Sequence, residues 1–223
     1  MSHTTQALSR SRFVAGCLFW ISGIQYFVIE FLAQRAWGPV PYTLRFNTIS
    51  DLGATICGTI PFMGTFACSP LHPLMNLSFI LSGALTIAGL LLLRPLFPKH
   101  WTVVLASWLI ILGSIGSIGV GIFPENEHPV PHLISALMLF MLANFGLIIL
   151  GTALRRLSWR PKFAWFTLIL GIIGLVAFLL LPLAITPLMG IGVLERFVAY
   201  PITVWVILSG MHLLAHPPAH LAR

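Results

Sequence analysis

The chain alternates six long apolar stretches with short polar or basic segments. Each stretch is apolar throughout and holds roughly the 20 residues that a helix needs to cross the hydrocarbon core of a bilayer. The strands of a transmembrane β-barrel would instead alternate in polarity. The pattern therefore predicts an all-α polytopic membrane protein, a six-helix transmembrane bundle forming a single domain of residues 1–223, with spans at 13–32, 73–93, 101–122, 131–153, 163–181 and 195–215.

The composition supports a membrane protein and excludes a water-soluble domain. Hydrophobic residues make up 58% of the chain and charged residues only 8%, whereas a soluble domain carries about 25% charged residues. The net charge of +7 would indicate nucleic-acid binding in a soluble protein. Here the basic residues lie in short segments between spans, where they determine topology, so we expect no nucleic-acid partner.

The distribution of Lys and Arg predicts the orientation. Basic residues concentrate in the N-terminal segment, the 94–100 and 154–162 turns and the C-terminus, whereas the alternate side has only Arg35, Arg45 and Arg196. Cytoplasmic loops carry the excess of Lys and Arg. We therefore expect a cell (inner or plasma) membrane protein with both termini in the cytoplasm and with the loop 33–72 outside.

The long outer loop at 33–72 is expected to be structured. Its Gly and Pro residues make a further full span unfavourable, so a membrane-surface or re-entrant segment fits better. Ser50 or Asp51 could cap a short helix by accepting backbone N–H bonds. Cys57 and Cys68 lie in the same loop and could form a disulfide if that side is oxidising.

A polar segment between the third and fourth spans, residues 121–132, marks a candidate site. It holds two of the five acidic residues of the chain and two histidines, and ionisable groups near hydrocarbon are costly. Given the predicted orientation, polar residues from several segments share its membrane face, where they could line an outward-facing pocket for a small ligand or a lipid headgroup from the surrounding membrane lipids. The pocket candidates are Asn47, Ser50, Asp51, Ser69, Asn76, Glu125, His128, His132, Glu195 and Arg196.

Several of these residues occur in short motifs that resemble a known family. The motifs are Asn47-x-x-Ser50-Asp51-Leu52, Ser69-Pro70 with Asn76, Gly121-x-Phe123-Pro124 with His132, and Glu195-Arg196 with Tyr200-Pro201. Together they resemble domain-of-unknown-function family 998, small prokaryotic six-span membrane proteins with a distant similarity to Frag1/DRAM-like proteins. The resemblance implies six spans over nearly the whole chain and brings no activity with it.

A divalent metal such as zinc is one hypothesis for the polar face. Asp51, His128 and His132 are residue types that bind zinc, and a zinc-activated water could hydrolyse a lipid ester or amide. The protein would then be a metal-dependent lipid hydrolase or transferase. However, Pro129 and Pro131 interrupt a continuous helix between the two histidines, so their spacing is not diagnostic, and whether the protein is an enzyme stays open.

Two non-enzymatic alternatives remain. The polar residues could form a structural network, with Arg196 paired to Asp51 or Glu125 across the bundle and Glu127 solvated in a loop, in a protein that is structural or binds partner proteins. A small-solute transporter is the other alternative, but ionisable residues are nearly absent from the middle of the spans, where transport pathways usually need them.

One packing prediction concerns the third span. Gly113, Gly116 and Gly119 lie on one face of the predicted helix. Small residues at such spacing allow two membrane helices to approach closely, so we expect this face to contact a neighbouring span.

Overall fold

The computed structural model describes residues 8–60, 64–185 and 190–221. Within that part of the chain, six helical segments are long and apolar enough to cross a membrane, which confirms the predicted fold class. They are Arg10–Arg35, His72–Leu96, Trp101–Ile122, Pro129–Arg156, Pro161–Leu183 and Ile191–Ala215.

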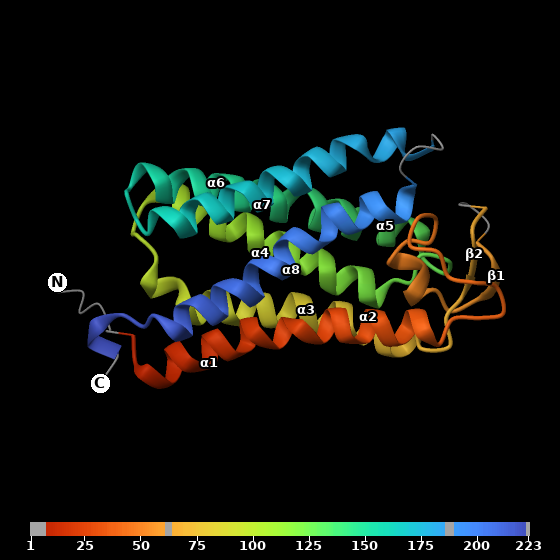
Figure 1. The fold of residues 1–223 in the computed structure, drawn as a ribbon, viewed down its shortest axis with the longest axis horizontal. Coiled ribbons are helices and arrows are strands. Elements are labelled where there is room, and N and C mark those ends of the chain that lie inside the picture. The colour runs from red at the N-terminus through yellow and green to blue at the C-terminus, as the bar shows by residue number, and fades with distance from the viewer. Residues whose placement is uncertain (1–7, 61–63, 186–189, 222–223) are drawn as a thin grey trace.

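The spans are built from eight α-helices and several shorter helical turns (Figure 1). The first span joins α1 (Arg10–Ile21) and α2 (Gln25–Arg35), and the fourth joins α5 (Pro129–Leu137) and α6 (Asn144–Arg156). The other spans contain α3 (His72–Leu93), α4 (Trp101–Ile122), α7 (Pro161–Leu180) and α8 (Ile191–Ala215).

The six spans form a closed ring. Helix α1 packs against α3 and α8, α4 lies between α3 and α6, and α7 lies between α6 and α8. The start of α1 and the end of α8 lie at one end of the bundle, and the loop after α2 covers the other end, beside α5 (Figure 1). The polar segments that the sequence assigned to one face are thus gathered at one end.

The glycine face of α4 makes the predicted close contact. A Cβ on Gly113 would lie 2.7 Å from the backbone nitrogen of Ala143, and a Cβ on Gly116 would lie 2.5 Å from the carbonyl oxygen of Ser135. Both neighbours belong to the fourth span. Because these glycines have no side chain, the backbones of α4 and the fourth span can approach each other directly.

The fourth span contains a π-helical turn, Met138–Ala143, between α5 and α6. The buried side chain of Asn144 follows it and donates hydrogen bonds from Nδ2 to the carbonyl oxygens of Phe140 (2.8 Å) and Val198 (3.0 Å). Such π turns are frequent at functional sites. Here the turn allows a polar side chain to connect the fourth span with α8.

The loop between α2 and α3 is structured, as predicted, and contains a small hairpin and a helical turn. Strands β1 (Cys57–Thr59) and β2 (Phe66–Cys68) pair antiparallel, and Cys57 and Cys68 form a disulfide. A short 3-10 helix, η2 (Ser50–Gly53), precedes the hairpin. The predicted disulfide pairing is therefore present in the structure.

The start of η2 is held by a reciprocal pair of hydrogen bonds. The backbone N–H of Thr48 donates to Asp51 Oδ2 (2.9 Å), and the backbone N–H of Asp51 donates to Thr48 Oγ1 (3.0 Å). This exchange resembles a capping box, in which two side chains satisfy each other's backbone donors. Asp51 accepts a backbone N–H bond, as the sequence indicated, but it lies inside η2 and is not its N-cap, which is Ile49. Thr48 is a partner that the sequence analysis missed.

The fourth and sixth spans are among those that begin earlier than predicted. Helix α5 starts at Pro129, because proline suits the first turn of a helix, where its missing N–H costs no hydrogen bond. Helix α8 starts at Ile191, directly after Gly190, which has a φ of 75°. The backbone N–H of Gly192 donates to the carbonyl oxygen of Arg45 (3.0 Å), so the long loop fixes the position of this helix start.

Candidate functional site

A cavity of about 290 Å³ lies where η2, α5 and α8 meet. Its lining includes Leu133, which is 57% exposed at the surface of the molecule. Its polar lining comes from Thr48, Ser50, Glu125, His132 and Glu195, and its apolar lining from Ile60, Pro129, Leu133, Ala136, Phe140, Leu181 and Ile191. Polar groups are thus confined to part of an otherwise apolar cavity.

Ser50 connects His132 and Glu195 within the polar lining. Its Oγ lies 3.1 Å from His132 Nε2 and 2.9 Å from Glu195 Oε1. Glu195 Oε2 also accepts a hydrogen bond from the backbone N–H of Ile49. On the other side of the imidazole ring, His132 Nδ1 lies 2.8 Å from the carbonyl oxygen of Phe123. These bonds connect α8, η2, α5 and the turn after α4.

The protons of this chain of hydrogen bonds can be counted. A carbonyl oxygen only accepts, so His132 Nδ1 donates to Phe123. Three bonds, Glu195–Ser50, Ser50–His132 and His132–Phe123, need three protons, and the hydroxyl and a neutral imidazole supply two. The third proton belongs on Glu195 or on His132, and in both forms the chain is neutral overall. Neutrality suits Glu195 and His132, which are both buried.

Glu125, which lines the cavity, forms an acidic pair with Asp51, which lies outside the lining. Both are buried, and their carboxyl groups lie in hydrogen-bonding contact. Burial raises the pKa of Glu125 well above its usual value, and the neighbouring Asp51 charge raises it further. Burial also raises the pKa of Asp51, against hydrogen bonds that lower it. A single proton shared between the two carboxyl groups explains how they lie together away from water.

Arg196 belongs to a separate cluster, which corrects its predicted pairing. Its Nε lies 3.2 Å from Glu30 Oε1 on α2, whereas the sequence analysis proposed Asp51 or Glu125 as partners. Consecutive residues on a helix point about 100° apart, so Glu195 faces the cavity while Arg196 faces the first span. Its other nitrogens donate to the Tyr42 hydroxyl and to the carbonyl oxygens of Asn47 (3.0 Å) and Gly192 (2.7 Å).

Glu30 is almost fully satisfied by this cluster. Besides Arg196, it accepts hydrogen bonds from the Tyr200 hydroxyl (2.8 and 2.9 Å) and from Gln34 Nε2 (2.8 Å). The Tyr42 hydroxyl also donates to the carbonyl oxygen of Thr48 (3.1 Å), and burial raises the pKa of Tyr42. This Glu30–Arg196 cluster, made of Glu30, Gln34, Tyr42, Arg196 and Tyr200, ties the long loop to α2 and α8.

The other predicted pocket residues have structural contacts outside the cavity lining. Asn47 Oδ1 accepts from the backbone N–H of Thr43 (3.0 Å), and Asn76 Nδ2 donates to the carbonyl oxygen of Gly53 (2.9 Å). Ser69 is buried in the loop end, where its carbonyl oxygen meets His72. His128 precedes α5 and its exposed ring packs on Phe123, while His132 lies in the first helical turn.

The proposed metal ligands do not converge. Among the residues that the structure describes, no three His, Cys, Asp or Glu side chains are arranged to hold a metal ion. His132 uses Nδ1 for Phe123 and turns Nε2 towards Ser50, while His128 is exposed and packs on Phe123. The geometry therefore gives no support to a zinc centre built from Asp51, His128 and His132.

Three residues of this end of the molecule were missed or undervalued by the sequence analysis: Thr48, Tyr42 and Glu30. Glu30 could have been found, because an acidic residue inside an apolar span almost always has a partner within the bundle. Thr48 and Tyr42 lie in a loop without periodicity, and nothing in their local sequence indicates a contact with α8.

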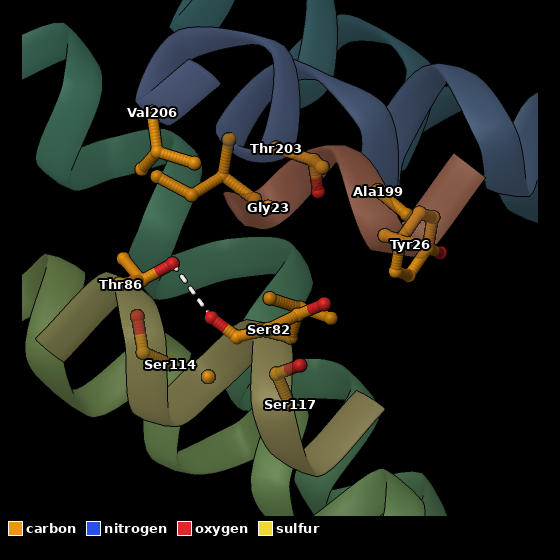
Figure 2. A pocket seen from close by; sticks show the side chains of 12 residues that line it. Gly23, Tyr26, Ser82, Thr86, Ser114, Ser117, Ala199, Thr203 and Val206 are labelled. Carbon is orange, nitrogen blue, oxygen red and sulfur yellow. Dashed lines mark hydrogen bonds between the residues drawn. The ribbon is translucent and has the colours of Figure 1, made fainter. Parts of the chain in front are cut away.

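A second, much smaller cavity lies in the middle of the bundle (Figure 2). Its volume of about 30 Å³ is sufficient for a water molecule. Figure 2 shows hydroxyl groups of Ser82, Thr86, Ser114 and Ser117 around it. The hydroxyls of Thr86 and Ser117 donate to helix carbonyl oxygens at 2.8 and 2.9 Å. These side chains are held by the helices, and the cavity is too small for an organic ligand.

The fold and this polar end define a multi-pass α-helical membrane protein whose long loop packs against its helices. The chain belongs to the family described as Protein of unknown function (DUF998), whose sequence profile matches residues 13–212. This confirms the family resemblance seen in the sequence. Neither a curated protein nor a solved structure matches the chain.

Proposed function

We propose that the protein binds an amphiphilic molecule of the membrane, such as a lipid, in the cavity between η2, α5 and α8. The cavity itself carries this proposal: about 290 Å³, apolar along most of its lining, with Ser50, Glu125, His132 and Glu195 grouped within it. Ligand cavities typically combine apolar walls with a few placed polar groups. A headgroup would meet the polar side chains, and an alkyl chain would pass along Ala136 and Phe140.

The orientation of the site follows from the distribution of charge. The basic 94–100 and 154–162 turns favour the cytoplasmic side, so the cavity would open near the outer leaflet of the cell membrane. The disulfide between Cys57 and Cys68 lies at the same end of the molecule and supports this, because disulfides persist in oxidising compartments.

Native mass spectrometry of the purified protein tests the proposal. We expect a retained lipid adduct on the wild-type protein and its loss in Ala136→Trp, which fills the cavity. Ile172→Trp, at an exposed position on α7, is the matched control and should keep the adduct. A folded Ala136→Trp protein that retains the same lipid would contradict the proposed site.

Acyl transfer is a second candidate function, favoured by the geometry of Ser50 and His132. The bond to Phe123 fixes the proton of a neutral imidazole on Nδ1, so Nε2 faces Ser50 Oγ as an acceptor at 3.1 Å. This is the arrangement of a serine nucleophile and its base. Ser50 Oγ would attack the acyl carbon of an ester, and its proton would pass through His132 to the leaving alcohol. Water would then release the acid.

A fluorophosphonate probe, which phosphonylates activated serines, tests this second function. We expect labelling of the wild-type protein and of Ser69→Ala, and none of Ser50→Ala. Equal labelling of wild type and Ser50→Ala would exclude Ser50 as a nucleophile and leave a binding protein.

A further inference from the structure

The Glu125 side chain is the most unusual polar group of the cavity. It is 4% exposed, it lines the cavity, and neither of its carboxyl oxygens has a hydrogen-bond donor among the described residues. Oδ1 of Asp51 also lacks a donor there. One proton shared with Asp51 satisfies one oxygen of Glu125 and leaves the other unpaired. A buried acceptor without a donor is costly, so a donor on a bound ligand would stabilise it.

The charge around the cavity indicates which kind of donor fits. Two of the five acidic residues of the chain, Glu125 and Glu195, line it, and none of the described residues in its lining is Lys or Arg, although the net charge of the chain is +7. The nearest basic group on α8, Arg196, is bound to Glu30 and to loop carbonyls. An anionic headgroup would therefore meet no cationic side chain in the lining.

His132 does not change the net charge of the cavity lining. Its Nδ1 proton is used by Phe123, and Nε2 faces Ser50. The hydrogen-bonded chain of Glu195, Ser50 and His132 is neutral when it holds its third proton. The Asp51–Glu125 pair with one shared proton keeps a single negative charge. One positive charge from a ligand would neutralise the buried end of the cavity.

We propose that the ligand is an amphiphile with a primary ammonium group, which donates to the Glu125 carboxylate while its alkyl portion lies along Ala136 and Phe140. This inference rests on the proposed binding function and specifies the class of ligand. An ammonium group has three donors and no acceptor. It can satisfy the unpaired oxygen of Glu125 and donate further hydrogen bonds to other lining oxygens. Hydrogen bonds between charged groups are about twice as strong as neutral ones.

Isothermal titration of the purified full chain in detergent tests this inference with three eight-carbon probes: octylamine, octanol and octanoate. We expect octylamine to bind the wild-type protein at least about tenfold more tightly than octanol, since its bond to Glu125 is charge-assisted, and octanoate to bind most weakly. Glu125→Gln should reduce the preference for octylamine over octanol to about twofold or less, because a neutral amide cannot offset the positive charge of the ammonium group. Glu127→Gln, an exposed acid two residues away, should keep it.

Other results would overturn the inference, and each points to a different error. Equal affinity of the wild-type protein for octylamine and octanol would remove the ammonium requirement, and this comparison does not depend on any variant folding. A preference that survives in Glu125→Gln would place the ammonium elsewhere. Ethanolamine, a soluble amine, distinguishes the source of the group: binding as tight as that of octylamine would contradict an amphiphilic ligand. Failure of all eight-carbon probes to bind would instead contradict the proposed binding function.

Discussion

Individual residues at the loop end of the bundle divide into two groups with different consequences. Glu30 and Arg196 are buried, paired and hydrogen-bonded on nearly every polar atom. Asp51 and Glu125 are buried with too few donors. Because a satisfied buried network fixes one structure while an unsatisfied group favours a ligand, the first group is expected to affect stability and the second binding.

Replacement of Arg196 by Met should strongly destabilise the protein. It leaves the Glu30 carboxylate buried without its cation and removes donors from the carbonyl oxygens of Asn47 and Gly192. Breaking one side of a buried ion pair costs about 3–5 kcal/mol. Unfolding in denaturing detergent measures the change, with the exposed Arg35→Met as the control, for which a change within about 0.5 kcal/mol is expected. Similar small losses in both variants would show that the pair is not important for stability.

The Asp51–Glu125 pair should make stability depend on pH. Both carboxyl groups have raised pKa values in the folded protein, so the folded state holds its protons more tightly than the unfolded state. The stabilisation is complete below the unfolded pKa of about 4 and is lost as pH rises through the folded pKa. The melting temperature of the wild-type protein should therefore fall over this range.

Glu125→Gln should flatten the dependence of the melting temperature on pH, because an amide replaces one of the two titrating carboxyl groups. Glu127→Gln removes an acid from the same segment, but an exposed one, and should retain the wild-type slope. Melting curves at a series of pH values, followed by tryptophan fluorescence in detergent, provide the measurement. Parallel curves for wild type and Glu125→Gln would contradict a shared proton between Asp51 and Glu125.

At the scale of elements, the contact between α4 and the fourth span depends on glycine. Gly116→Val would place a side chain 2.5 Å from the carbonyl oxygen of Ser135, and overpacking of this kind costs about 1–3 kcal/mol. The melting temperature should drop accordingly. Leu112→Val, on an exposed part of the same helix, controls for the effect of a β-branched residue. Equal melting temperatures of the two variants would mean that the helices can separate at little cost.

The elements also show how much of the fold the sequence predicts. Six apolar runs predict six spans because a membrane helix needs little more than length and hydrophobicity. The glycine face of α4 was predictable from the spacing of its small residues. The breaks were harder to predict. The 3-10 turn Ser22–Ile24 in the first span contains a Ser-Gly pair, a common site of helix kinks, whereas the π turn Met138–Ala143 lies in apolar sequence with no such signal.

The candidate site was predictable only in part, since its residues come together through the fold. Ser50, Glu125, His132 and Glu195 could be selected as polar residues at one membrane face, and the structure places all four in the cavity lining. Their partners could not be predicted, because Glu195 and Arg196 are adjacent in sequence yet serve different clusters. The metal hypothesis gains no support at this step: the residue types were suitable, but no three of them converge among the described residues.

For the whole molecule, the asymmetry of basic residues predicts that the loop end faces outwards. In a variant without native cysteines, Glu127→Cys should react with a membrane-impermeant maleimide on intact cells, whereas Lys99→Cys should react only after the membrane is permeabilised. Glu127 lies at the loop end and Lys99 in the turn between α3 and α4. The reverse labelling pattern would invert the orientation and place the cavity at the cytoplasmic leaflet.

The central claim is that a membrane amphiphile occupies the cavity between η2, α5 and α8. Photo-crosslinking in native membranes with a lipid that carries a photoreactive group on its acyl chain, followed by peptide mass spectrometry, tests it most directly. The account predicts crosslinks to Ala136 and Phe140, which line the cavity, above those to exposed positions such as Ile172. Crosslinks distributed over the exposed helix faces, with none at Ala136 or Phe140, would contradict it.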